Sequence, residues 1–203
     1  MKIICIGQNY IDHIKEMGNE IPSQPVIFLK PDSAILRKNA PFFIPDFSNE
    51  IHHELELVVK INRIGKNIPV KFASRYFDEI TLGVDFTARD IQREMRKTGM
   101  PWEIAKAFDG SAPIGDFVST NEISDINNAS FHLLKNGEMV QKGNTENLLF
   151  KIDEIISHVS KYFTLKIGDL IFTGTPSGVG KVEVGDRLQA YLEDKKIMDF
   201  KIC

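Results

Sequence analysis

Cysteine is nearly absent from this 203-residue chain, which contains only Cys5 and Cys203. The two lie near opposite ends of the sequence, and neither belongs to a CxxC pair or a Cys/His cluster. This scarcity excludes a zinc-ligand motif and a disulfide framework, and it fits a reducing compartment. Cys5 lies in an apolar segment, where we expect it to serve packing.

Long apolar runs and an excess of one charge are also missing. No stretch reaches the roughly 20 residues that a membrane helix needs, and the opening MKIICIGQNY is too short for a signal-peptide core. The formal net charge is only −3 and the basic residues are spread out, so no nucleic-acid surface is predicted. We therefore expect a cytoplasmic protein with neither membrane nor nucleic acid as partner. The same sequence would suit an organellar protein that has lost a transit peptide.

Repeats, low-complexity tracts and linkers are absent, so residues 1–203 are predicted to form one domain. Many strand-like segments and few helical ones are typical of a sheet-dominated α+β fold. Strands are predicted over 2–7, 26–30, 54–61, 80–85, 169–174, 186–192 and 197–202. Helices are predicted over 10–17, 88–97 and 145–163, Asn136-Gly137 predicts a hairpin, and 194–196 a turn between the last two strands.

Three carboxylates stand at the ends of two predicted strands. Glu54 and Glu56 are two residues apart in HHELELVV, so they share one face of a strand, and Asp85 ends the apolar run ITLGVD. If the strand ends converge, these oxygens form a site suited to Mg²⁺ or Mn²⁺, which indicates an enzyme acting on a small oxo acid. A Glu-x-Glu pair is more often the solvated face of a half-buried sheet, and that alternative stays open here.

His13 and Glu16 are spaced i, i+3 on the predicted helix 10–17, so their side chains share a face and can form a hydrogen bond. A histidine oriented by a carboxylate is a general base with a fixed tautomer. The alternative is a surface ion pair. Glycine and asparagine on both sides of this helix favour a mobile lid.

Polar residues also follow Asp85. Arg89 and Gln92 share a face of the predicted helix 88–97. Lys106 lies in the apolar stretch EIAKAF, where it could hold a carboxylate or enolate oxygen, or extend past apolar neighbours to solvent. Asp109 could pair with Lys106 or support the metal.

A glycine-rich loop, TGTPSGVG, begins at the end of the predicted strand 169–174. It is not a P-loop, because Thr175 stands in the place of the first glycine and Val182 in the place of the Ser/Thr. The loop is either a tight turn or a site where Thr175 and backbone amides bind a substrate carboxylate.

The chain resembles the fumarylacetoacetate hydrolase domain family through segments that follow the family's order. They are GQNYIDHIKEMGN, PVIFLKP, HHELELVV, GVDFTARDIQ, PWEIAKAFD, GNTENLLF, ISHVSKYFTLKIGDLIFTGTPSGVG and VGDRLQAYL. Together they span nearly the whole chain and are most similar to the acylpyruvase and oxaloacetate decarboxylase branch. The resemblance implies a mixed β-sheet roll with a few helices, a short lid helix, a Mg²⁺ or Mn²⁺ site and a homodimer.

The resemblance also implies roles for individual residues. Gln8 departs from the family pattern, since relatives often carry a basic residue there. The implied metal ligands are Glu54, Glu56 and Asp85, the implied catalytic dyad is His13 and Glu16, and the implied substrate contacts are Arg89, Gln92, Lys106 and Thr175.

The functional hypothesis is metal-dependent cleavage of the C3–C4 bond of a small 2-oxo acid through a metal-stabilised pyruvate enolate, to which Lys106 could add. Acylpyruvate hydrolysis would need His13 and Glu16 to activate water, whereas oxaloacetate decarboxylation reaches the same enolate without water. A keto–enol tautomerase or isomerase, a sugar-acid dehydratase and a non-catalytic oxo-acid-binding protein are the alternatives.

Overall fold

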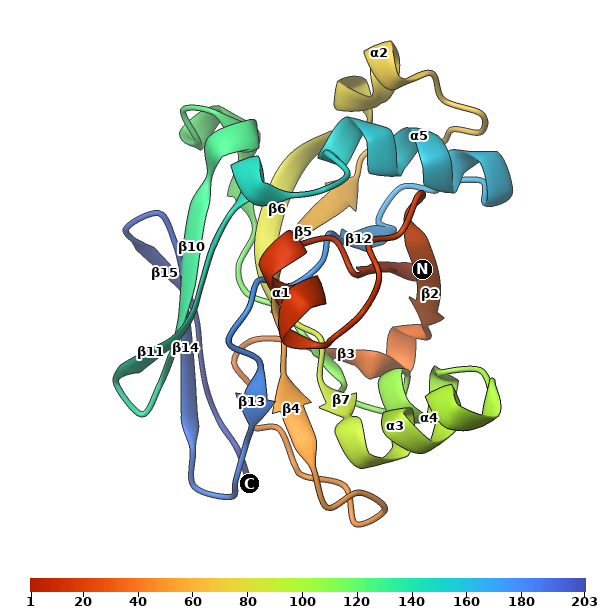
Figure 1. The fold of residues 1–203 in the computed structure, drawn as a ribbon. Helices are drawn as coiled ribbons and strands as arrows, with labels where there is room; N and C mark the ends of the chain where they lie inside the picture. The colour runs from red at the N-terminus through yellow and green to blue at the C-terminus, as the bar shows by residue number, and fades with distance from the viewer.

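A six-stranded mixed sheet is the dominant element of the computed structural model, which describes residues 1–203 (Figure 1). Its strand order is β2-β1-β12-β5-β6-β9, in which β1 and β12 are parallel and all other neighbours antiparallel. The strands are β1 Ile3–Gly7, β2 Val26–Lys30, β5 Leu55–Ile61, β6 Phe77–Val84, β9 Val118–Ser119 and β12 Leu170–Phe172. The predicted α+β class with a mixed sheet is confirmed.

A second, antiparallel sheet has the order β11-β10-β14-β15, and two small sheets have the orders β13-β4-β7 and β3-β8. The strands of the second sheet are β10 Ser130–Lys135, β11 Glu138–Asn144, β14 Arg187–Leu192 and β15 Lys195–Lys201. Those of the small sheets are β3 Ile35–Leu36, β4 Ile51–His53, β7 Thr87–Ala88, β8 Ala112–Pro113 and β13 Gly180–Lys181. One cluster of 36 buried apolar residues includes side chains from both large sheets, so the two share a core.

The helices are short and lie around the sheets (Figure 1). They are α1 Ile11–Glu16, α2 Val70–Ala73, α3 Arg89–Thr98, α4 Glu103–Lys106 and α5 Ile152–Tyr162, with 3₁₀ turns at Asp32–Ala34, Ser74–Tyr76, Thr120–Glu122, Ile126–Asn128 and Thr145–Asn147. Helices α2 and α5 pack together, whereas α3 and α4 lie near β7 at the opposite end of the molecule. No helix combines the length and apolar character needed to cross a membrane.

The helix predicted over 145–163 is wrong in its first seven residues, because α5 begins only at Ile152. Tertiary hydrogen bonds compete with the helix in that segment. The N–H of Leu149 donates to the Asn9 carbonyl at 2.8 Å, and the N–H of Phe150 donates to the Asn9 side chain at 2.7 Å. The local helical preference therefore yields to contacts made with the segment before α1.

The remaining predicted elements are present within a few residues of their expected bounds. The Asn136-Gly137 hairpin joins β10 and β11, with both residues at positive φ, 55° and 88°. The last hairpin turns at Glu193 and Asp194, one residue earlier than expected, because β15 already starts at Lys195. The short strands β3, β4, β7, β8, β9 and β13 and the helices α2 and α4 were not predicted.

The antiparallel pairing of β5 with β6 positions the candidate site. Leu55 pairs with Val84, so the start of β5 lies beside the end of β6. The N–H of Asp85 then donates to the Glu54 carbonyl at 2.8 Å, which continues the pairing past the strand ends. Because side chains alternate along a strand, Glu54 and Glu56 point away from the face on which Leu55 joins the main core.

Candidate active site

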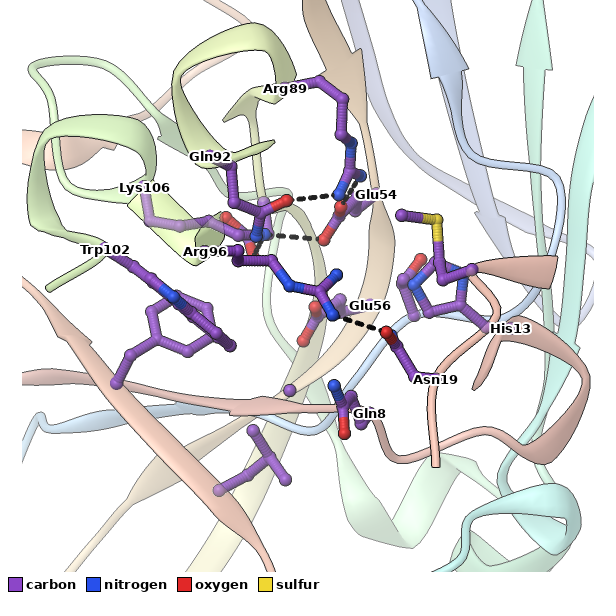
Figure 2. A pocket seen from close by; sticks show the side chains of 16 residues that line it. Gln8, His13, Asn19, Glu54, Glu56, Arg89, Gln92, Arg96, Trp102 and Lys106 are labelled. Atoms are coloured by element: carbon purple, nitrogen blue, oxygen red, sulfur yellow. Dashed lines mark hydrogen bonds and ion pairs between the residues drawn. The ribbon is translucent and has the colours of Figure 1, made fainter. Parts of the chain in front are cut away.

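Three buried carboxylates line a pocket between α1 and the α3–α4 segment (Figure 2). Glu54, Glu56 and Asp85 each offer one oxygen, and these oxygens all lie within 4.8 Å of one another. Their burial shows that the alternative of a solvated sheet face is wrong. Carboxylate oxygens are the ligands that Mg²⁺ and Mn²⁺ prefer, so the cluster could hold a divalent cation.

Two of these carboxylates are incompletely satisfied by protein donors. Glu56 accepts one hydrogen bond, from the Gly174 N–H at 2.7 Å, and burial together with the charge of Asp85 raises its pKa. Asp85 Oδ1 is buried and receives no hydrogen bond, since Lys30 Nζ lies 2.8 Å away but outside hydrogen-bonding geometry. A bound cation would reduce the repulsion and engage the free oxygen, so the residues present fit a metal ion.

Lys30 is a site residue that sequence reasoning missed. Its side chain is fully buried, and its ammonium donates to Ser111 O and Ser111 Oγ, both at 3.0 Å, and to the Lys106 carbonyl. Phe28, two residues earlier on β2, lines the pocket. The two-residue period of a strand could therefore have placed Lys30 on the pocket side.

Lys106 joins two of the carboxylates. Its Nζ lies 2.8 Å from Glu54 Oε2 and 2.6 Å from Asp85 Oδ2. Burial alone would lower the pKa of Lys106, but these two carboxylates outweigh burial and raise its pKa above the usual value, so the side chain stays cationic. The alternative that Lys106 extends to solvent is wrong, and Asp109, expected as a possible partner, is exposed and forms no ion pair with it.

Arg89 and Gln92 lie one turn apart on α3, and both are buried beside the cluster. Arg89 Nη1 donates to Gln92 Oε1 at 2.6 Å, and its Nη2 pairs with Glu54. Burial opposes the charge on Glu54, but Lys106 and Arg89 outweigh it and hold the pKa of that carboxyl below its usual range. These cations thus favour the ionised form of Glu54, whereas burial and the charge of Asp85 disfavour the ionised form of Glu56.

His13 projects from α1 on the side of the pocket opposite Lys106 (Figure 2). Its Nδ1 lies 3.0 Å from Glu16 Oε2, so the proton is assigned to Nδ1 and Nε2 is the free nitrogen. Glu16 also accepts a hydrogen bond from the Gly178 N–H at 3.1 Å, which ties α1 to the glycine-rich loop. The alternative of a surface ion pair does not describe His13, which is buried and lines the pocket.

The glycine-rich loop supports the site through its backbone. Gly174 has a φ of +105°, and a Cβ there would lie 2.7 Å from a neighbouring side chain, so the position requires glycine. Thr175 is buried in the pocket wall, where its hydroxyl donates to Leu55 O and accepts from Gln141 Nε2, both at 2.9 Å. Contact between Thr175 and a substrate stays a prediction.

Further residues of α3 and of other segments complete the pocket, and most of them were not predicted. Arg96 follows Arg89 by seven residues and Gln92 by four, a spacing that places all three on one face of α3 and could have revealed it. Gln8, the residue that departs from the family pattern, also lines the pocket. The lining residues not predicted from sequence include Met17, Asn19, Phe28, Arg96 and Trp102.

Comparisons with known proteins show what the whole chain is similar to. The family described as fumarylacetoacetate (FAA) hydrolase C-terminal matches residues 2–202. The chain is 43% identical over 200 residues to the mitochondrial oxaloacetate tautomerase FAHD1 of Rattus norvegicus, covering 98% of this chain and 90% of the relative. It is 43% identical over 185 residues to the mitochondrial oxaloacetate decarboxylase of Dictyostelium discoideum, covering 91% and 85%. The crystal structure of fumarylpyruvate hydrolase from Pseudomonas aeruginosa with Mn²⁺ and pyruvate superposes with a TM-score of 0.94 at 35% identity, covering 100% of this chain and 89% of that one.

Proposed function

The chain belongs to the fumarylacetoacetate hydrolase C-terminal family, and on that premise we propose that it is a Mg²⁺- or Mn²⁺-dependent enzyme that cleaves the C3–C4 bond of a small 2-oxo acid. The observation that carries the proposal is the joint burial of Glu54, Glu56 and Asp85 beside Lys106, with His13 across the pocket. The Mn²⁺ and pyruvate in the Pseudomonas aeruginosa relative support both the cation and a pyruvate product.

Each polar side chain has a place in this reaction. Glu54, Glu56 and Asp85 would hold a divalent cation, which would supply polarisation of the substrate's oxygens. Arg89 and Gln92 orient the substrate at the inner end of α3. The Lys106 ammonium, held 2.8 Å from Glu54 Oε2 and 2.6 Å from Asp85 Oδ2, places a positive charge where the enolate charge develops.

His13 acts as the general base for acylpyruvate hydrolysis. Glu16 holds the Nδ1 proton, so Nε2 takes a proton from water and the hydroxide attacks the acyl carbonyl at C4. The C3–C4 bond then breaks, its electron pair remains on the pyruvate enolate, and return of the proton to C3 yields pyruvate and a carboxylic acid. For oxaloacetate, loss of CO₂ gives the same enolate without an attacking water.

A keto–enol tautomerase is the second candidate, favoured by the 43% identity to a protein named oxaloacetate tautomerase. In that reaction His13 would remove a proton from C3, and a proton would be returned at the substrate oxygen, with no carbon–carbon bond broken. The same base and the same cationic surroundings serve both candidates.

Product analysis separates the two candidates. The protein is incubated with acetylpyruvate or oxaloacetate in excess Mg²⁺ or in EDTA, with the rate of metal alone subtracted. Pyruvate is measured by coupling to lactate dehydrogenase, and keto–enol interconversion by ultraviolet absorbance. We expect Mg²⁺-dependent pyruvate release from at least one substrate. Faster interconversion without pyruvate would select the tautomerase, and neither activity would reject both.

A further inference from the structure

Arg96 differs from the other cations of the pocket because no carboxylate engages it. Arg89 pairs with Glu54, and Lys106 lies between Glu54 and Asp85. Arg96 forms no ion pair, and its one hydrogen bond runs from Nη2 to Asn19 Oδ1 at 2.6 Å. An arginine that lines a pocket and contacts only a neutral amide has an unused capacity to bind an anion.

Arg96 lies at the outer part of the pocket, so an anion bound to it would lie there too. It lies on the same face of α3 as Arg89 and Gln92, but two turns from Arg89, and it is exposed where those two are buried. Figure 2 shows its guanidinium reaching across from α3 to Asn19, in the segment that follows α1. Substrate groups that project away from the carboxylate cluster would meet this side chain.

The charges of the pocket favour a ligand with two negative groups. The three buried cations, Lys30, Lys106 and Arg89, equal the three buried carboxylates in number, and a divalent cation would favour the ionised form of Glu56, which pairs with none of them. A divalent cation would then leave an excess of two positive charges, and Arg96 adds a third. A single substrate carboxylate offsets only part of this excess, whereas a dicarboxylate offsets more of it.

We propose that Arg96 binds a second carboxylate at the distal end of a dicarboxylic 2-oxo acid. The inference rests on the proposed function, which places the 2-oxo acid end at the carboxylate cluster. The distal carboxylate replaces the amide oxygen of Asn19 and accepts two charge-assisted hydrogen bonds from the guanidinium. Arg96 thereby selects dicarboxylic over monocarboxylic substrates.

A matched pair of 2-oxo acids without a carbonyl at C4 tests this by binding alone. The ligands 2-oxopentanedioate and 2-oxopentanoate have the same carbon chain and differ only in the distal carboxylate. Their dissociation constants are measured by calorimetry on the full chain with Mg²⁺ at low ionic strength. We expect the wild type to bind the dicarboxylate about five- to tenfold more tightly, a preference that Arg96→Gln abolishes and Arg96→Lys partly keeps.

Two control variants separate the carboxylate contact from other effects. Lys97→Gln removes the same charge from the next residue of α3, which pairs with Glu94 and does not line the pocket, so the preference should match the wild type. Asn19→Ala removes the hydrogen bond to Arg96 but leaves its charge, so the preference should persist or grow. An unchanged preference in Arg96→Gln, its loss in Asn19→Ala, or no binding of either ligand would overturn the inference. An Arg96-dependent preference in a protein that releases no pyruvate would reject the proposed cleavage alone.

Discussion

Replacement of Lys30 by methionine would test how the buried carboxylates are held. Methionine keeps the approximate length of the side chain and removes its charge. In the protein, Lys30 Nζ lies 2.8 Å from Asp85 Oδ1 and donates to three acceptors on Lys106 and Ser111. Removing one partner of a buried ion pair costs about 3–5 kcal/mol. Because Asp85 keeps its contact with Lys106, we expect the lower end, a loss of about 3 kcal/mol in the free energy of unfolding.

The assay is urea unfolding and calorimetry in EDTA, with Lys60→Met as the matched control. A loss of about 3 kcal/mol should lower the Tm by about 6–12 °C in a chain of this size. Lys60 also pairs with a carboxylate, Glu79 at 2.5 Å, but both side chains are about a third exposed (34% and 41%), so its loss should cost less than about 1 kcal/mol. Equal losses in the two variants would refute the reasoning. Added Mg²⁺ should raise the Tm of Lys30→Met at least as much as that of the wild type, because the site has become more negative.

Further expectations concern the base, the metal, pH and assembly. His13→Ala should lower the rate of acylpyruvate hydrolysis by about 10²–10⁴-fold, and Glu16→Ala should have a similar effect. The double variant should be little worse than either single variant, and oxaloacetate decarboxylation should fall less. Hydrolysis at the wild-type rate in His13→Ala would remove the dyad from the mechanism. Glu56→Ala should lose or weaken Mg²⁺ binding in a calorimetric titration, and an unchanged isotherm would exclude it as a ligand. Burial lowers the pKa of His53 to about 4, below its ordinary value of 6.5, so the unfolded chain takes up the proton first. The free energy of unfolding should therefore fall by up to about 3 kcal/mol between pH 6.5 and 4. His53→Gln should flatten this slope in urea titrations, and an unchanged slope would show that His53 does not cause it. Sedimentation should show a homodimer, and a 23.0 kDa species alone at micromolar concentration would contradict it.

The carboxylate cluster could be predicted because its geometry follows from local rules. Strand alternation places Glu54 and Glu56 on one side, and the end of an apolar run marks Asp85. The i, i+3 spacing likewise brings His13 and Glu16 together, as the 3.0 Å distance between them shows. The pairing of β5 with β6 could be expected only from the family resemblance, because pairing between distant segments leaves no local signature in the sequence.

Residues whose environment is created by distant segments could not be predicted in this way. Lys30 ends an apolar strand, and the same local sequence would suit a lysine that reaches solvent. Its acceptors on Lys106 and Ser111 are 76 and 81 positions away in the chain. The false start of the last helix has the same origin, since Asn9 supplies the hydrogen bonds that displace helical ones from a segment 141 positions further on.

The location of the dyad on α1 would make the choice of reaction depend on any movement of that helix. His13 and Glu16 lie on the same six-residue helix, which the bond from Gly178 ties to the glycine-rich loop. Any shift of α1 that widens the pocket carries the dyad away as a unit, while Lys106 and the carboxylates stay on the sheet side. With the pocket open, bound oxaloacetate could still lose CO₂. Water could not be activated, because the dyad would be out of reach. The ratio of decarboxylation to hydrolysis would then depend on the fraction of time that α1 spends docked against the pocket. It would also depend on how fast CO₂ is lost compared with how fast α1 closes.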